Sequence, residues 1–389
     1  MYGSMYTDES YKGAVQESFA NCAIGPPSVT LVISVPPLEL SLDISPRGRL
    51  DVIDVRAQAL ATYGDVFERY NRCLYCSLHT TAGYLPQSFA TRLGSGPQGV
   101  RPYIDLFTTV FPEGAGYHHD DLDRRTELTA EQRPVEPTNA DSHLAFIGSG
   151  LRACVSYVTR RPGPVSFIDL DGVNAGKPRK RMTTLVGYDT EIEVARTTLH
   201  VPVSSTHPVD AVNLKDARLG LYDQLDELIR KHGVEKGRVR MHLSPGEQFA
   251  SLTVNEYETL LMRYDLAEVL RNPLWFAAQR AKHAWDDPRA VPSKAIDYAK
   301  YDLVRALNRL VDTLGLAESA FERVFSQALA VPASRFLRMK RSVDLLVSDS
   351  KTTGRGAVVE GTYQAPIMVQ WRRAARGERQ VSVTLSRFI

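Results

Sequence analysis

The chain of 389 residues is 43% hydrophobic and 24% charged, and its 47 basic and 45 acidic residues give a formal net charge of +2. Such a chain is long enough to bury a substantial core, and its length is typical of two domains. The near balance of charge excludes a global field that attracts nucleic acid or anionic lipid, and the longest apolar stretches fall far short of the roughly 20 residues that span a bilayer.

The first part of the chain mixes strand-like and helix-like patterns, which predicts an α and β domain. Residues 1–27 show no clear period, so we expect an N-terminal extension before a core that begins near Ser28. In chain order, the predicted elements are strands at 28–35 and 38–42, a helix at 53–63, a strand at 72–78, a helix at 101–111 and a strand within 148–157.

The apolar period then changes to 3.6 residues, which is typical of helices. A helix with its apolar face at Leu221 and Leu225 is predicted to end at Gly233, and Thr253-Val254-Asn255-Glu256 resembles a capping box that opens the next helix. Residues 211–340 are therefore predicted to be a mainly helical inserted domain. Strand patterns return at 343–347, 357–371 and 380–388. The core is thus expected to be discontinuous, with parts at 28–210 and 341–389.

Three histidines lie in short motifs that end in loops or turns, and they are the strongest indication of chemistry. His79-Thr80-Thr81-Ala82-Gly83 follows a predicted strand, Tyr117-His118-His119-Asp120 comes next, and Asn139-Ala140-Asp141-Ser142-His143-Leu144 is the third. Three such positions are better explained by one convergent site than by packing.

These motifs, together with Gly361-Thr362-Tyr363-Gln364 in a closing strand, resemble the YjbQ family, often labelled secondary thiamine-phosphate synthase-like. The resemblance covers roughly residues 29–160 and 343–388. It implies an α+β fold with a β-sandwich-like core, a homotrimer, and thiamine-phosphate synthase-like chemistry. The helical domain would be a lineage-specific insertion.

Two departures from the family pattern bear on function. The family usually has an Asn-Glu pair shortly after the first histidine motif, whereas this chain has Gln87-Ser88, so a carboxylate is expected to be missing there. The family tryptophan is Tyr363, which keeps an aromatic wall and adds a hydroxyl.

The residue types suit a metal site. Imidazoles of His79, His119 and His143 could bind one divalent metal, for which zinc is the expected choice, and leave a fourth position for water or substrate. Asp120 or Asp141 could orient an imidazole. The same histidines could instead bind phosphate, move a proton or be structural. The predicted catalytic residues are His79, His119, His143 and Asp120, and the predicted substrate-binding residues are Thr80, Thr81, Gly83, Asn139, Arg152 and Gln364.

Two hypotheses follow for the whole protein. The first is a metal-dependent enzyme that transfers or hydrolyses a group on a small phosphorylated or anionic molecule. The second is a non-catalytic protein of the same fold, whose helical insertion serves partner binding or assembly. Four cysteines and no signal-like start predict a cytoplasmic protein with free thiols, and neither membrane nor nucleic acid is expected as a partner.

Other candidate sites have simpler explanations. Cys73 and Cys76 are predicted to be structural thiols. The Asp169–Gly172 segment is favoured as a turn over a magnesium site. The basic segment 177–181 is expected to be a solvated loop or a positive rim near an anionic ligand.

Overall fold

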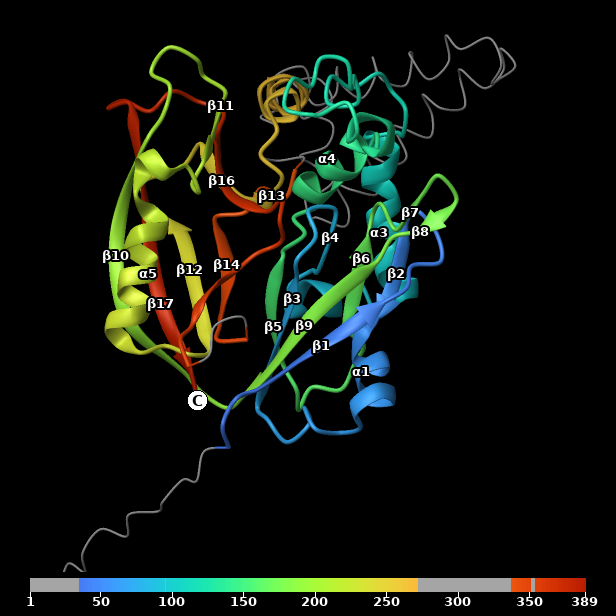
Figure 1. The fold of residues 1–389 in the computed structure, drawn as a ribbon, viewed down its shortest axis with the longest axis vertical. Helices are drawn as coiled ribbons and strands as arrows, with labels where there is room; N and C mark the ends of the chain where they lie inside the picture. The colour runs from blue at the N-terminus through green and yellow to red at the C-terminus, as the bar shows by residue number, and fades with distance from the viewer. Residues whose placement is uncertain (1–34, 95, 272–336, 351–353) are drawn as a thin grey trace, which may run out of the picture. The chain divides into compact units, whose positions relative to one another are not determined.

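The computed structural model describes residues 35–94, 96–271, 337–350 and 354–389 (Figure 1). The expected N-terminal extension, the strand at 28–35 apart from its last residue, and residues 272–336 of the predicted helical domain lie outside the described residues.

A four-stranded antiparallel sheet organises the chain up to residue 190. Its order is β1-β9-β3-β5, and a smaller sheet has the order β2-β6-β4. Helix α1 (Val55–Tyr63) starts where the Asp54 carboxylate accepts hydrogen bonds from two backbone N–H groups, and it ends at Gly64 with φ 68°. The strands are β1 (Leu38–Ile44), β2 (Asp51–Asp54), β3 (Arg72–Ser77), β4 (Ala82–Gly83), β5 (Cys154–Val158), β6 (Ser166–Asp169), β7 (Val173–Asn174), β8 (Lys177–Pro178) and β9 (Arg181–Tyr188). The other helices are α2 (Gln87–Arg92), α3 (Pro97–Val110), a 3-10 turn at Arg133–Val135 and α4 (Ala140–Gly148).

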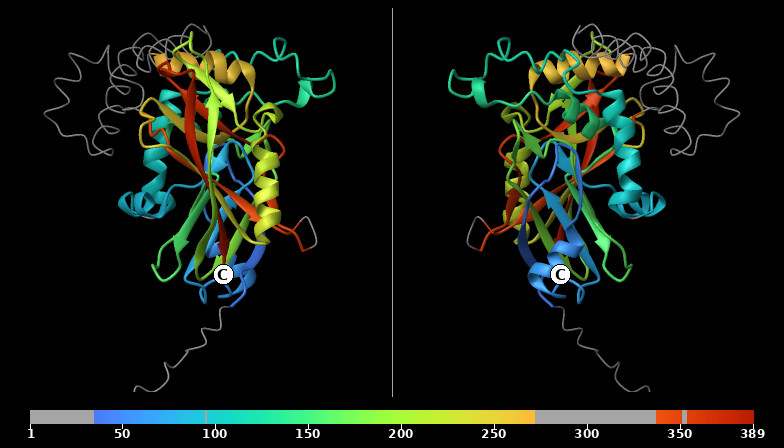
Figure 2. Two further views of the ribbon diagram at one scale, coloured as in Figure 1. Left: turned by 90° about the vertical axis from the view of Figure 1, so that its left-hand side faces the viewer. Right: turned by 90° about the vertical axis from the view of Figure 1, so that its right-hand side faces the viewer.

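The rest of the chain builds a second antiparallel sheet of order β10-β17-β12-β14-β15, with a smaller sheet of order β11-β16-β13. Helix α5, yellow in the ribbon, lies beside the strands of this sheet (Figure 2). Its apolar residues belong to one buried cluster with residues of β10, β12 and β17. The strands are β10 (Glu191–Pro202), β11 (Asp210–Asn213), β12 (Gly237–Leu243), β13 (Ala250–Asn255), β14 (Ser342–Ser348), β15 (Ala357–Val359), β16 (Ala365–Gln370) and β17 (Glu378–Phe388). The helices are a 3-10 turn at Ala217–Leu219, α5 (Leu221–His232), a π-helical turn at Leu261–Asp265 and α6 (Leu266–Arg271).

The two parts repeat one topology. In the first part, β9 pairs with β1 and with β3, which follows helix α1, and β5 lies beyond β3. In the second part, β17 pairs with β10 and with β12, which follows helix α5, and β14 lies beyond β12. The smaller sheets correspond in the same way, because β6 lies between β2 and β4, and β16 lies between β11 and β13. Helices α1 and α5 occupy the same place in this order. We call residues 35–190 the first half and residues 191–389 the second half.

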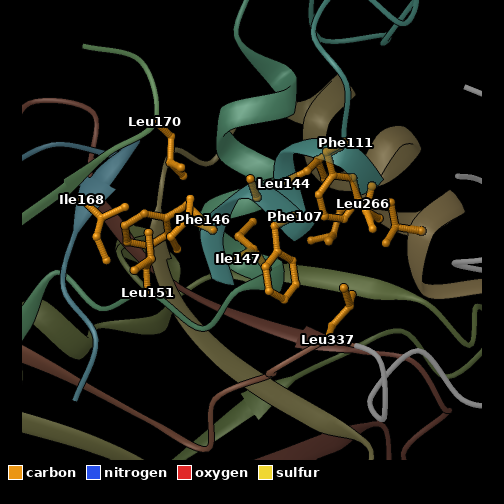
Figure 3. Packing of buried hydrophobic residues seen from close by; sticks show 14 of the residues in the cluster. Phe107, Phe111, Leu144, Phe146, Ile147, Leu151, Ile168, Leu170, Leu266 and Leu337 are labelled. Carbon is orange, nitrogen blue, oxygen red and sulfur yellow. The ribbon is translucent and has the colours of Figure 1, made fainter. Parts of the chain in front are cut away.

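A shared hydrophobic cluster joins the halves. Phe107 and Ile147 of the first half belong to the same buried cluster as Leu266 and Leu337 of the second (Figure 3). Burial of such side chains stabilises the folded chain by about 1.5 to 3 kcal/mol each relative to exposure. The halves therefore fold against each other through a continuous apolar core.

The predicted helical insertion is not supported. In the described part of 211–340, β12 pairs with β14 and β17, and β13 pairs with β16. Strand β12 is an interior member of its sheet, and β13 is an edge strand paired with the C-terminal segment, so this range belongs to the β framework. The predicted capping box is also wrong, because Thr253 to Asn255 are buried residues of β13. Burial on both faces removed the alternation by which a strand is recognised in a sequence.

Other local predictions are confirmed. The strand predicted at 38–42 is β1, the helix predicted to end at Gly233 is α5, and the strand predicted at 72–78 is β3. The third histidine motif differs, because it forms the first turn of α4 and not a strand end.

Candidate active site

His119 is fixed in the loop between α3 and α4 by contacts from the second half. Its backbone N–H donates to the Asp265 carboxylate at 2.9 Å, and its Nδ1 lies 3.0 Å from Oε2 of Glu258. Its Nε2 lies 3.4 Å from Oδ1 of Asn139, whose amide nitrogen donates to Asp171 at 2.7 Å. The imidazole is therefore buried between a carboxylate and an amide oxygen.

His143, in the first turns of α4, is fixed in one tautomer. Its Nδ1 lies 2.7 Å from Oδ1 of Asn255, while the amide nitrogen of Asn255 donates to the Thr80 carbonyl at 2.8 Å. Because the amide nitrogen is used in this way, the oxygen faces the ring and Nδ1 must carry the proton. Nε2 then presents a lone pair, and it lies 3.5 Å from Oε2 of Glu256.

The two imidazoles are neighbours with opposite electrostatics. The ring centroids are 5.3 Å apart in an edge-to-face arrangement. Burial opposes charge on His119, but its hydrogen bond to Glu258 and the nearby carboxylates of Glu256 and Asp120 together outweigh that cost and raise its pKa. Burial and the charge on His119 hold the pKa of His143 well below its usual value. The surroundings thus favour the protonated form of His119, whose two ring nitrogens both lie near acceptor oxygens, and the neutral form of His143.

The carboxyl groups around the histidines are also perturbed. Burial and the carboxylates of Glu136 and Glu258 raise the pKa of Glu256, whereas Glu258 has a lowered pKa because its hydrogen bonds outweigh the effect of burial. Burial raises the pKa of Asp120 to about 6, and its carboxylate accepts a hydrogen bond from Ala140 N–H at the start of α4. Perturbed groups of this kind cluster at functional sites.

A cavity of about 390 Å³ opens onto this cluster. Glu256 and Glu258 belong to its wall, together with Arg125, Tyr363 and Gln364. The Arg125 side chain is almost fully buried and forms ion pairs with Glu127 at 2.6 Å, Glu136 at 2.9 Å and Glu256 at 3.4 Å. His119 and His143 are not part of this wall, but each contacts one of its two glutamates.

His79 has a different environment from the other two histidines. Its Nε2 accepts a hydrogen bond from Met182 N–H at 3.0 Å, and burial together with Arg181 and Arg179 lowers its pKa to about 4. Its backbone carbonyl accepts from the Gln364 amide at 3.0 Å. No group of three His, Cys, Asp or Glu side chains in the described ranges is arranged to hold a metal ion. The three-histidine ligand set therefore does not fit this arrangement, and the zinc site stays a prediction from sequence.

The remaining predicted substrate residues are dispersed. Thr80 contributes its carbonyl to Asn255, and Thr81 accepts a hydrogen bond from Arg181 at 3.3 Å. Gly83 is required by packing, because a Cβ there would lie 2.5 Å from the Arg152 carbonyl oxygen. Arg152 lines a different cavity.

The acidic and basic segments that follow β6 form buried ion pairs. Arg181 forms a two-pronged pair with Asp169 at 2.7 and 2.9 Å, and Arg179 pairs with Asp171. The basic segment 177–181 is therefore not simply a solvated loop, because the buried Arg181 is committed to a structural ion pair.

Sequence reasoning missed the residues that the second half contributes. The Asn-Glu pair expected after the first histidine motif is absent at Gln87-Ser88, but Asn255-Glu256 stands beside His143 in the folded chain. In the sequence this pair stands within the predicted capping box, and in the structure it lies at the end of β13. The carboxyl group beside His143 therefore comes from the second half of the chain.

The sequence matches no protein-family model, and no curated protein matches it. Solved structures similar to this chain include a YbjQ-like protein of unknown function from Sulfolobus solfataricus, with 16% identity and a TM-score of 0.26 over 51% of this chain and 99% of that one. A hypothetical protein from Aeropyrum pernix also matches, with 16% identity and a TM-score of 0.26 over 49% and 98%. An uncharacterized conserved protein of the YjbQ/UPF0047 family from Clostridium acetobutylicum has 13% identity and a TM-score of 0.24 over 49% and 99%. Every helix in the described ranges is too short or too polar to cross a membrane.

Proposed function

We propose that the cavity beside His143 is the active site of an enzyme that uses Glu256 and His143 for proton transfer during hydrolysis or group transfer on a small molecule. The observation that carries this proposal is the 3.5 Å separation between Nε2 of His143 and Oε2 of Glu256 at a cavity wall. An imidazole nitrogen with a free lone pair beside a carboxyl group is a common arrangement for general acid–base catalysis.

The direction of proton movement follows from the hydrogen bonds. Asn255 keeps the proton of His143 on Nδ1, so only Nε2 can accept another. Glu256 lies between that nitrogen and the cavity, and its raised pKa favours the protonated carboxyl group that a general acid needs. Glu256 would contact the substrate, and His143 would receive or return its proton.

The pair of His119 and Glu258 supports this chemistry electrostatically. The two side chains are 3.0 Å apart, and Glu258 also accepts hydrogen bonds from two backbone N–H groups. The positive charge on His119 next to His143 keeps His143 neutral. We assign His119 a positioning role, because Glu258 and Asn139 occupy its two nitrogens.

The charge of the cavity wall bears on the substrate. Its charged residues are Glu127, Glu136, Glu256, Glu258, Arg125 and Lys215. Arg125 is neutralised by three of these glutamates and Lys215 by Glu360 at 2.7 Å. The remaining acidic character of this wall favours a substrate that presents hydrogen-bond donors or a positive group to it. The phosphorylated or anionic substrate and the divalent metal remain predictions from the sequence, and the trimer remains one that rests on the family resemblance.

Two chromogenic esters, p-nitrophenyl phosphate and p-nitrophenyl acetate, test the proposal with the purified full chain. Glu256→Gln and His143→Gln should each lower turnover by about 100-fold or more, the usual contribution of general acid–base catalysis. Glu127→Gln is the matched control, because Glu127 lines the same cavity but its side chain is 50% exposed. Equal rates in Glu256→Gln and Glu127→Gln would reject the role of Glu256. A wild-type chain that cleaves neither ester would favour the non-catalytic alternative.

A further inference from the structure

A second cavity, of about 720 Å³, lies where the two halves meet away from the histidines. Its wall combines Cys154 and Ser156 of β5 with Arg238 and Arg240 of β12 and Asp344 of β14. Arg152, which precedes β5, lines the same space. The lining residues given for this cavity and for the cavity beside His143 do not overlap.

The carboxylates of this wall are already committed to other partners. Glu191 accepts two hydrogen bonds from Arg238, at 2.6 and 2.5 Å. Asp344 is shared, at 2.7 Å from Nε of Arg240 and 3.6 Å from Nη1 of Arg238. The third carboxylate of the wall, Asp189, accepts a hydrogen bond from the Asn71 N–H at 2.8 Å. None of the three therefore forms an ion pair with Arg152.

Arg152 is oriented but electrically uncompensated. Its Nη1 donates to the Ser342 carbonyl at 2.9 Å, which fixes the guanidinium plane across the junction of the halves. In the described part of the chain, no carboxylate lies within ion-pair distance of Arg152 or of its neighbours Arg338 and Lys340. Arg338 instead packs over the Phe89 ring at 3.7 Å, and Lys340 donates to the Leu151 carbonyl.

This concentration of positive charge is costly without an anion. Burial, together with Arg240, Arg338 and Arg238, lowers the pKa of Arg152, although Asp344 opposes the shift. Lys340 is 6% exposed, and burial and the charge on Arg152 hold its pKa well below the usual range. Cationic side chains are rarely buried without a partner of opposite charge.

We propose that the end of this cavity at Arg152 binds the phosphate group of a small molecule. The guanidinium presents parallel N–H donors that match two phosphate oxygens, and one of its nitrogens is already held in place by Ser342. Arg240 would add a second positive charge from β12. From the sequence, Arg152 is predicted to bind substrate together with residues of the histidine motifs. In this proposal it would bind an anion at a separate site, at the opposite end of α4.

The test is the stabilisation of the full chain by inorganic phosphate, by glycerol phosphate and by citrate, at constant ionic strength set with chloride. A ligand that binds only the folded state raises the unfolding temperature by an amount that grows with the logarithm of its concentration relative to its Kd. We expect both phosphates to stabilise the wild type, and Arg152→Gln to weaken their affinity about tenfold or more, the loss expected for a hydrogen bond to a charged group. Citrate should stabilise less, because the site is proposed for phosphate.

Arg196→Gln is the matched control, because Arg196 is an exposed arginine paired with Glu193 on β10. It should bind phosphate as the wild type does. Arg240→Gln provides a second test if Arg152→Gln does not fold, and it should also weaken binding. No stabilisation by either phosphate, equal affinity in all variants, or stronger stabilisation by citrate than by phosphate would overturn the proposal. Glu256→Gln should bind phosphate normally, so failure of the proposed acid–base function would leave this result unchanged.

Discussion

Nε2 of His143 lies 3.5 Å from Oε2 of Glu256, and these side chains come from opposite halves of the chain. The first half supplies both buried histidines, and the second half supplies the two glutamates and the asparagine that contact them. Neither half alone contains these contacts. A repeated topology has therefore produced a site at the junction of the repeats.

The link between Asn255 and His143 predicts a specific cost of substitution. Asn255→Leu removes the acceptor of His143 Nδ1–H and the donor to the Thr80 carbonyl, leaving two buried polar groups without these partners. Each such loss costs about 1 to 3 kcal/mol. Chemical denaturation should show a fall of about 2 kcal/mol or more in the free energy of unfolding. Asn174→Leu, at a partly exposed position of β7, should change it by less than about 1 kcal/mol.

Packing at Gly83 predicts a second effect, on a residue that the sequence assigned to substrate binding. A Cβ at Gly83 would lie 2.5 Å from the Arg152 carbonyl oxygen and 2.9 Å from the Phe146 ring. Gly83→Ala should therefore destabilise the chain by about 1 to 3 kcal/mol, as overpacking does. Gly246→Ala is the control, because nothing lies within 4 Å of a Cβ there. Equal stability of the two variants would contradict the packing explanation.

The sequence predicted local features well and distant contacts poorly. Gly233 ends α5 and Arg72 opens β3 as expected, because capping and alternation are written in neighbouring residues. The partnership of Asn255-Glu256 with His143 joins residues more than 100 positions apart, and no local pattern encodes such a distance. The predicted meeting of His79 with His119 and His143 depends on distant contacts of the same kind, and in the fold the three imidazoles have different hydrogen-bond partners.

The lowered pKa of His79 predicts that the folded chain loses stability in acid. Burial lowers its pKa in the folded chain from 6.5 to about 4. Between these values the unfolded chain binds a proton that the folded chain does not, so stability must fall as the pH falls through this window. The free energy of unfolding of the wild type, measured relative to that of His79→Gln, should therefore be lower at pH 4.5 than at pH 7. A difference that stays constant over this range would show that His79 is not held neutral.

The raised pKa of His119 predicts that its contribution to stability changes with pH in the opposite direction to that of His79. One experiment can therefore distinguish the two histidines. The pKa of His119 is raised above 6.5, because the bond to Glu258 and the carboxylates of Glu256 and Asp120 together outweigh the effect of burial. The stabilising contribution of His119 is full below pH 6.5 and is lost as the pH rises through the raised folded value. Glu258 has a lowered pKa, so its contribution is present above 4.5 and is lost in stronger acid. The wild type should therefore exceed His119→Gln in stability by more at pH 5.5 than at pH 8.5, as measured by chemical denaturation. His79→Gln, compared over the same two values, should show the reverse trend, and matching trends in the two variants would contradict the assigned charge states.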